Sequence, residues 1–109
     1  MIIREWRGRA AKSNSEAYPQ HFRTKVAPEL RQVPGFIGAD LSQRVLNDKI
    51  EFLVLTKWYS MDVIRRFAGS DVGKAVVEPG AVAALVDFDD RVHHYEVVET
   101  TSSTDSRDS

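Results

Sequence analysis

The chain of 109 residues contains no cysteine. This absence excludes disulfide bonds, thiolate nucleophiles, thiolate zinc sites and cysteine-ligated iron–sulfur clusters. No apolar run approaches the roughly 20 residues that a membrane-spanning helix needs. Residues 1–6 are too short and too charged for a signal peptide. We therefore expect a cytoplasmic protein that does not have a membrane as a partner.

An excess of basic residues is also missing. Fifteen lysines and arginines stand against sixteen acidic residues, which gives a net charge of -1, and the basic residues are scattered along the chain. A nucleic-acid-binding surface requires massed positive charge. Nucleic acid is therefore not an expected partner.

Hydrophobic residues make up 42% of the chain, which is enough for the core of one domain. Residues 1–99 form this expected domain, and the polar residues 100–109 form a tail that we expect to be disordered. The apolar spacing predicts a helix over residues 16–33, which Pro28 should interrupt because it has no N–H group. The other expected segments are a strand over 1–9, strands over 36–46 and 49–58, a helix over 60–67, short helices over 71–77 and 81–85, a loop over 87–90 and a strand over 91–99.

This order predicts an α+β fold of the ferredoxin-like type, βαββ(α)αβ, with a four-stranded antiparallel sheet and helices on one face. Leu53 and Leu55 point away from the expected helices, and one face of the last strand is also too apolar for water. A homodimer packed sheet against sheet, which makes a dimeric α+β barrel, would cover them.

Trp58 closes an apolar strand just before the helix that starts at Ser60. We expect its large ring at the mouth of a cavity, with a partner or an opening beside its indole N–H. If Arg4 and Trp6 share that face, the cavity has aromatic walls and one fixed cation. Such a cavity suits a small planar aromatic or enolate-forming molecule better than a sugar or a peptide.

The three histidines are the candidate bases. His93 and His94 are neighbours on a strand and point to opposite faces, so they cannot chelate one ion together, and no metal site is expected. His21 lies on the flank of the first helix. Each histidine is either a hydrogen-bonded, half-buried residue or a proton acceptor that lines the pocket. The candidate catalytic residues are thus Trp58, His94, His93 and His21, and the candidate substrate-binding residues are Arg4, Trp6, Tyr18, Phe22, Phe67 and Tyr95.

Three segments carry a family resemblance: residues 22–38 (F-x-x-x-V-x-P-x-L-x-x-x-P-G-F-x-G), residues 55–60 (L-T-K-W-Y-S) and residues 94–97 (H-Y-E-V). They resemble the antibiotic biosynthesis monooxygenase domain, a branch of the dimeric α+β barrels, over residues 1–99. The resemblance implies a ferredoxin-like protomer, a homodimer and a pocket between sheet and helices. Some members of this family oxidise phenolic polyketides to quinones with molecular oxygen and no metal or flavin, and others degrade haem.

The haem-degrading branch fits poorly. Residues 70–77 are similar to its second-helix motif, whose last position is the iron-ligating histidine, and this position is Val77 here. The first-strand asparagine of that branch falls at or next to Trp6, where no asparagine is present. Haem degradation is therefore disfavoured.

The resemblance implies a cofactor-independent monooxygenase in which Trp58 takes the family position. One histidine would make a phenolate or enolate that Arg4 stabilises. The alternative is a non-catalytic small-molecule-binding or stress-response barrel. An enzyme should have an open cavity beside Trp58 that a histidine reaches, whereas a binding module could have this cavity filled by Trp6, Phe67 and Phe88.

Overall fold

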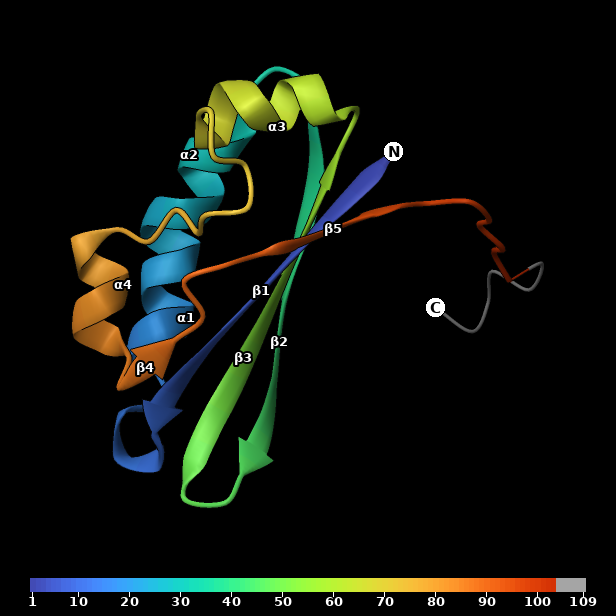
Figure 1. Ribbon diagram of the computed structural model, residues 1–109. Coiled ribbons are helices and arrows are strands. Elements are labelled where there is room, and N and C mark those ends of the chain that lie inside the picture. Colours follow the sequence, from blue (N-terminus) through green and yellow to red (C-terminus); the bar gives the residue numbers. More distant parts are fainter. Residues whose placement is uncertain (104–109) are drawn as a thin grey trace.

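The computed structural model describes residues 1–103 and shows one antiparallel sheet with helices on one side (Figure 1). Three long strands, β1 (Ile2–Ala11), β2 (Phe36–Leu46) and β3 (Lys49–Trp58), lie in the order β2-β3-β1. Two short strands, β4 (Asp87–Phe88) and β5 (His93–Glu96), both pair with the outer edge of β1. The predicted α+β, ferredoxin-like fold is confirmed, with five strands in place of four.

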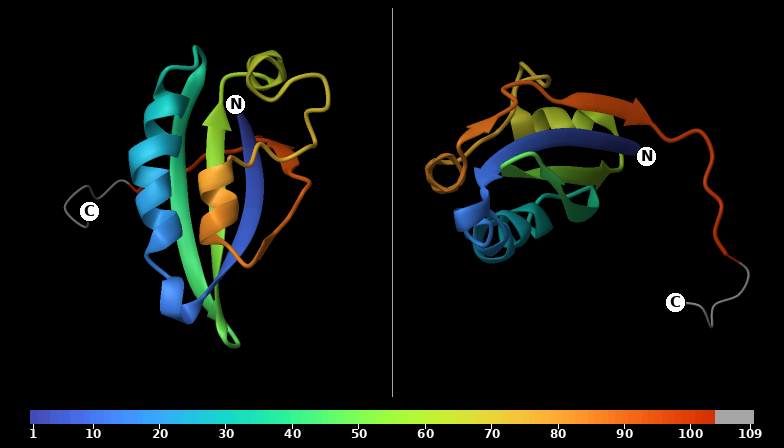
Figure 2. Two further views of the ribbon diagram at one scale, coloured as in Figure 1. Left: turned by 90° about the vertical axis from the view of Figure 1, so that its left-hand side faces the viewer. Right: turned by 90° about the horizontal axis from the view of Figure 1, so that it is seen from below.

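The helices cover a single face of the sheet. Figure 2 shows the continuous run of α1 (Ala17–His21), the π turn η2 (Phe22–Val26) and α2 (Ala27–Arg31) in front of the strands, with α4 (Pro79–Ala84) beside it. The short 3-10 turn η1 (Lys12–Asn14) precedes this run, and α3 (Met61–Ala68) lies at the end of the sheet where β3 finishes. None of the helices within residues 1–103 is long and apolar enough to cross a membrane.

Pro28 interrupts the first helix as predicted, and the interruption takes the form of a wide turn. The N–H of Ala27 donates to the carbonyl of Phe22, five residues earlier. Because Pro28 has no N–H, it cannot continue the ordinary pattern back to Thr24. The π turn accommodates this gap without ending the helical run.

The predicted helix over residues 71–77 is wrong. This segment is a loop in which Lys74 forms an isolated bridge with Arg91. Gly73 and the β-branched pair Val76 and Val77 are poor helix formers, so local preference did not support a helix there. Pro79 does not end a helix but begins α4, where its fixed φ is favourable at the first turn.

The last predicted strand, over residues 91–99, is shorter than expected, and part of the predicted loop over 87–90 is a strand. The N–H groups of Val86 and Asp89 donate to the carbonyls of Arg9 and Arg7 at 2.8 and 2.9 Å, and these bonds hold β4 on β1. The chain then leaves the sheet, and the N–H of Val92 donates to Gly73 at 2.8 Å before β5 begins. Residues 104–109 of the predicted tail lie outside the described part of the chain.

The junctions around β2 and β3 agree with the sequence. Asn47 takes a positive φ of 57° in the predicted turn, and the Ser60 side chain accepts from the N–H of Val63 at the start of α3. Gly35 has a φ of 88°, and a Cβ there would lie 2.5 Å from a Val63 methyl group. Glycine is therefore required at position 35 for both its conformation and its close contact with α3.

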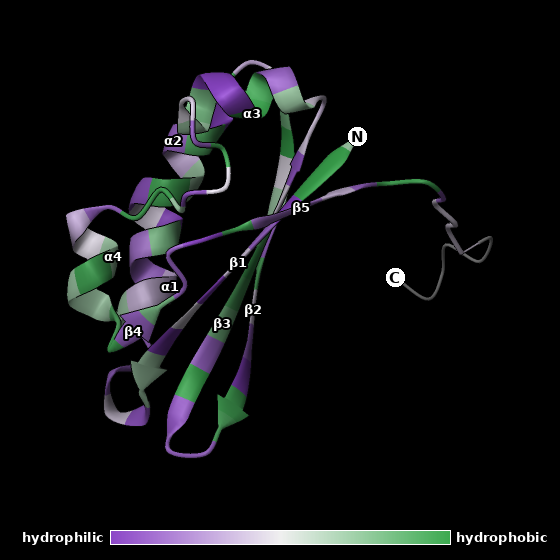
Figure 3. Ribbon diagram, in the orientation of Figure 1, coloured by the Kyte–Doolittle hydropathy of each residue, from purple (hydrophilic) through white to green (hydrophobic). Residues whose placement is uncertain are grey.

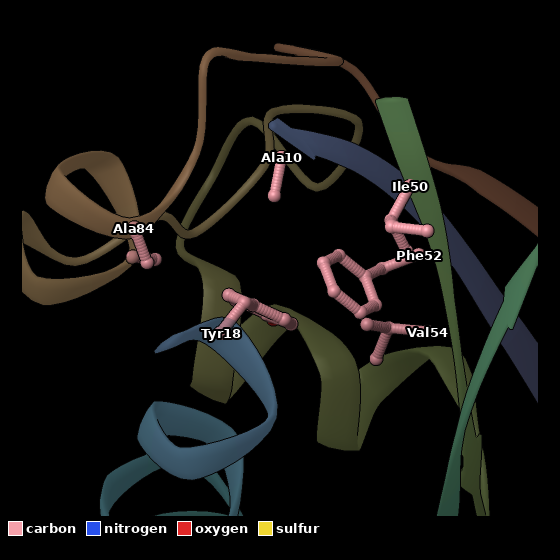
Figure 4. Close-up of a cluster of buried hydrophobic side chains, with 7 residues drawn as sticks. Ala10, Tyr18, Ile50, Phe52, Val54 and Ala84 are labelled. Atoms are coloured by element: carbon pink, nitrogen blue, oxygen red, sulfur yellow. The ribbon is translucent and has the colours of Figure 1, made fainter. Parts of the chain in front are cut away.

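Two buried clusters fill the space between sheet and helices. The first cluster (Figure 4) joins β1 and β3 to α1 and α4 and contains Ala10, Tyr18, Ile50, Phe52, Val54, Ala81 and Ala84. The second cluster lies nearer α2 and α3 and contains Leu30, Trp58, Val63 and Ile64. Figure 3 shows that β3 carries a hydrophobic stretch between more hydrophilic ends, and its alternate residues Phe52 and Val54 are buried against the helices.

The helix-free face carries charged and apolar side chains side by side, since Leu53 and Leu55 pair with Arg7 and Glu5 of β1. Arg9 forms ion pairs with Asp87, with Asp89 at 2.8 Å and with Glu51 at 3.3 Å. Leu53 and Leu55 alternate onto the same face and stay only half-buried. No helix of the described chain covers them (Figure 1).

Candidate functional site

A cavity of about 170 Å³ lies between the two core clusters. An apolar cavity of about 150 Å³ is large enough for benzene, whereas pockets for drug-sized ligands start near 300 Å³. The cavity therefore has room for one aromatic ring. Six of the predicted site residues line it: Arg4, Trp6, Tyr18, His21, Trp58 and Phe67.

Four predicted site residues do not line the cavity. His93 and Tyr95 alternate onto the helix-free face of β5, where they pair with Glu5 and Ile3, and Tyr95 is 53% exposed. Phe22 packs at the edge of the first cluster. His94 lies on the same sheet face as Arg4, its strand partner, and contacts the Arg4 guanidinium without lining the cavity.

Arg4 is a buried cation. Its side chain lies on the cavity face of β1, the residue is 6% exposed, and the guanidinium stands 5.9 Å from the centre of the Phe67 ring. Nη1 donates to the carbonyl of Val72 at 2.7 Å, and Nη2 donates to the carbonyl of Lys74 at 3.0 Å. Burial lowers the pKa of Arg4 to about 10, so the group is still protonated at neutral pH.

No carboxylate within residues 1–103 forms an ion pair with Arg4. The third acceptor of the guanidinium is Nε2 of His94, which lies 2.9 Å from Nη1. These three contacts leave the Nε hydrogen and one Nη2 hydrogen of the five that a guanidinium carries. A buried cation with neutral partners and spare donors beside a cavity favours a ligand with an anionic oxygen.

His94 is neutral in this arrangement. A guanidinium can only donate, so Nε2 of His94 must accept from Arg4, and the ring proton then sits on Nδ1. Burial, followed by the charges of Arg4 and His93, lowers the pKa of His94. Its acceptor nitrogen is therefore occupied by Arg4 and is not available to a ligand in the cavity.

Trp58 forms an inner wall of the cavity, and the expectation that its ring stands at the mouth is wrong. The residue is 0% exposed, and its ring packs between Phe36 and Phe67 at centroid distances of 5.3 and 5.1 Å. Its Nε1–H donates to Oγ1 of Thr56 at 2.7 Å. Thr56 was missed at the sequence level, although its place two residues earlier on the same strand face was a usable signal.

His21 is the histidine that lines the cavity. Its Nε2 atom is buried and has no hydrogen-bond partner among the residues that the structure describes. The ring lies against Gly80, where a Cβ would come within 2.8 Å of Nδ1, and 6.0 Å from the ring centre of Tyr18. Among the three histidines, His21 is therefore the one whose side chain a ligand in the cavity would contact.

Two glutamates that the sequence did not identify complete the lining. Burial raises the pKa of Glu78, and a hydrogen bond with Glu29 and the charge of Glu29 raise it further. Glu29 is exposed and Glu78 is half-exposed, so they mark the side on which the cavity meets solvent. Burial and the charge of Glu78 also raise the pKa of Tyr18, so this phenol stays neutral.

Within the described chain, no group of three or more His, Cys, Asp or Glu side chains is arranged to hold a metal ion. The site thus consists of aromatic and aliphatic walls, one buried cation, one unpartnered imidazole nitrogen and an acidic pair toward solvent. These groups can bind a single ring, accept its hydroxyl proton and hold the resulting anion.

Comparisons with known proteins agree on the fold. The sequence model of a family described as antibiotic biosynthesis monooxygenase matches residues 1–79. A candidate antibiotic biosynthesis monooxygenase from Deinococcus radiodurans is 18% identical, with a TM-score of 0.64, and the match covers 96% of this chain and 100% of that one.

Two further solved structures have a described chemistry. The heme degrader MhuD from Mycobacterium tuberculosis, with two hemes bound in its active site, is 16% identical over 94% of this chain and 100% of that chain, with a TM-score of 0.60. SnoaB from Streptomyces nogalater, a cofactor-independent oxygenase, is 14% identical, and the match covers 94% of this chain and 98% of that chain with a TM-score of 0.55. No curated protein sequence matches significantly. At these identities the solved structures support the fold alone.

Proposed function

We propose that this chain, which belongs to the antibiotic biosynthesis monooxygenase family, is a monooxygenase that oxidises a small, electron-rich aromatic or enolisable molecule with O2, without a metal ion or flavin. The observation that carries the proposal is the cavity beside Trp58 that His21 reaches. A non-catalytic binding module could have this space filled by Trp6, Phe67 and Phe88. Trp6 and Phe67 instead stand at its walls, and Phe88 does not line it.

The residues supply the two functions that such a reaction needs. His21 accepts the proton of a phenol or enol, because its side chain lines the cavity and its Nε2 atom has no hydrogen-bond partner in the described chain. The spare N–H groups of Arg4 hold the resulting oxyanion. Trp58 offers the ring a flat wall that its hydrogen bond to Thr56 keeps in place.

The reaction balances with oxygen alone. The anion passes one electron to O2, and the phenoxyl radical and superoxide then combine into a C–O bond. Loss of water breaks the O–O bond and leaves a quinone, so that one phenol and one O2 give one quinone and one water. No external reductant is required, and the protein contributes the base, the anion site and the exclusion of water.

Haem is a poor fit for this site. The cavity of about 170 Å³ accommodates one ring and not a porphyrin. Val77 lies on the cavity wall and offers no iron ligand, as the sequence predicts. We therefore propose single-ring phenols, hydroquinones or enols as the substrate class.

The helix-free sheet face supports the proposal of a homodimer. Leu53 and Leu55 lie half-buried on this face without helical cover from the described chain. In sedimentation, one species of twice the chain mass is expected at micromolar concentration. Leu55→Glu should weaken association, because it would bury an unpaired charge. Val45→Glu, a matched change at a residue that is 64% exposed, should not, and a stable wild-type monomer would contradict the proposal.

Oxygen uptake tests the catalytic proposal. A panel of single-ring phenols, hydroquinones and enolisable diketones is given to chelator-treated protein without added flavin. Turnover by the wild type should fall about 100-fold or more in His21→Ala, the usual effect of losing a general base. Gln20→Ala, the exposed neighbour on α1, is the matched control. Uptake no faster than the protein-free rate across the panel would favour the binding module.

A further inference from the structure

The guanidinium of Arg4 is held by groups from the far end of the chain. Its two carbonyl acceptors belong to Val72 and Lys74, and its third acceptor is Nε2 of His94 at 2.9 Å. Arg4 and His94 are also direct partners in the pairing of β1 with β5. Of these three acceptors only the imidazole can lose its lone pair, by taking up a proton.

We propose that His94 is a positioning residue whose neutral imidazole holds the Arg4 guanidinium toward the cavity, so that the protein prefers an anionic ligand only while His94 is unprotonated. This inference rests on the proposed role of Arg4 as the anion site but not on the oxygen chemistry. The sequence analysis named His94 as a candidate base, whereas this inference makes it the residue that positions Arg4.

Protonation of His94 removes the contact. Both ring nitrogens would then be donors, and two cationic groups would stand 2.9 Å apart with no carboxylate of residues 1–103 paired to Arg4. The charged and titratable groups that act on His94 are Arg4 on β1 and His93 on β5, and both oppose protonation. Burial acts in the same direction, so His94 is neutral at pH 7.

Another titratable group of the cavity acts in the opposite sense. Burial and Glu29 raise the pKa of Glu78, so this carboxylate loses its negative charge as the pH falls. This change favours an anion in the cavity. Weaker anion binding in acid, against this change in charge, would therefore report that the Arg4 guanidinium has left the position in which His94 holds it.

Two probes of one size isolate this effect. Benzenesulfonate is an anion throughout the range from about pH 5 to pH 8, and benzenesulfonamide is its neutral counterpart. Each carries a single ring, for which the cavity of about 170 Å³ has room. Calorimetric titration of the whole protein gives both dissociation constants for the wild type and for His94→Gln, His94→Ala and His93→Gln.

At pH 7 the wild type and His94→Gln should prefer the sulfonate, because the amide oxygen of glutamine also accepts from Arg4. His94→Ala should bind the sulfonate about tenfold more weakly and leave the sulfonamide unchanged. As the pH falls below the ordinary histidine pKa of about 6.5, the sulfonate affinity of the wild type and of His93→Gln should decrease, whereas that of His94→Gln should not.

The proposal is overturned if His94→Ala retains the sulfonate preference at pH 7, or if His94→Gln shows the same loss in acid as the wild type. Should His94→Ala fail to fold, His94→Gln and the nitrogen NMR signals of the imidazole still decide. These signals must show the Nδ1–H tautomer of His94 at pH 7, and the Nε2–H tautomer would contradict the contact. If sulfonate binding depends on pH and on the His94 variants as expected but no oxygen uptake is found, the proposed oxygenase function is wrong and the role of His94 stands.

Discussion

Replacing Thr56 with valine tests the inner wall of the cavity. The side chain keeps its shape, but the indole N–H of Trp58 loses its acceptor at 2.7 Å, in a residue that is 0% exposed. An orphaned buried donor costs about 1–3 kcal/mol, and the added methyl group offsets part of this. We therefore expect the free energy of unfolding to fall by about 1–2 kcal/mol. For a domain of this size, Tm should fall by roughly 4–12 °C.

A double-mutant cycle separates this hydrogen bond from other effects of the substitution. Urea unfolding is measured at one protein concentration, because association would add to the apparent stability. In the Trp58→Phe background the indole N–H is absent, so Thr56→Val should cost close to nothing. Thr56→Ser keeps the oxygen and serves as the control. An equal cost of Thr56→Val in both backgrounds would refute the assignment of this bond.

Three further predictions concern the anion site, the β2 junction and the acidic pair. Arg4→Lys keeps the charge but loses the planar fork, so benzenesulfonate affinity should fall about tenfold in calorimetry while benzenesulfonamide binds as before. Gly35→Ala should lower the free energy of unfolding in urea by about 2–4 kcal/mol, because the φ of 88° and the Val63 methyl at 2.5 Å both oppose a Cβ. The raised pKa of Glu78 means that its contribution to stability is present below the ordinary value of 4.5 and is lost as pH rises through the folded-state pKa. Glu78→Gln should therefore stabilise the protein at pH 7, because it removes a charge that Glu29 repels, and it should not stabilise the protein in acid. Thermal unfolding at both pH values measures this, and an equal effect at the two would contradict the prediction.

The parts of the fold that the sequence predicted are those with strong local signals. β2 and β3 begin and end at the predicted residues, because strand-forming residues continue up to the Asn47 turn at one end and to Gly35 and Ser60 at the other. The position of α3 follows from its Ser60 cap and from Gly69. These signals act over a few residues and need no distant contact.

The chain from residue 70 to residue 99 has weaker local signals, and the predictions there were less accurate. Contacts with distant residues decide its path, such as the bond from the N–H of Val92 to Gly73 at 2.8 Å and the bridge between Lys74 and Arg91. This path also brings Glu78 to Glu29 and the carbonyls of residues 72 and 74 to Arg4. Strand alternation could place Arg4, Trp6 and Trp58 on one face, but it could not show which histidine reaches them.

The π turn at residues 22–26 sets an angle between the two halves of the first helix. Each step of four residues in an α-helix turns about 40° beyond a full circle, so the spacing from Tyr18 through Phe22 and Val26 to Leu30 would drift off the sheet. The wider turn winds less per residue and takes back part of this drift, and Tyr18 and Leu30 are both 3% exposed. Deleting one residue there would replace the wide turn with an ordinary α-helical one, whose four steps of about 100° nearly equal the five smaller steps that they replace, so α1 would keep His21 on the cavity side while the hydrogen-bonding pattern became uniform.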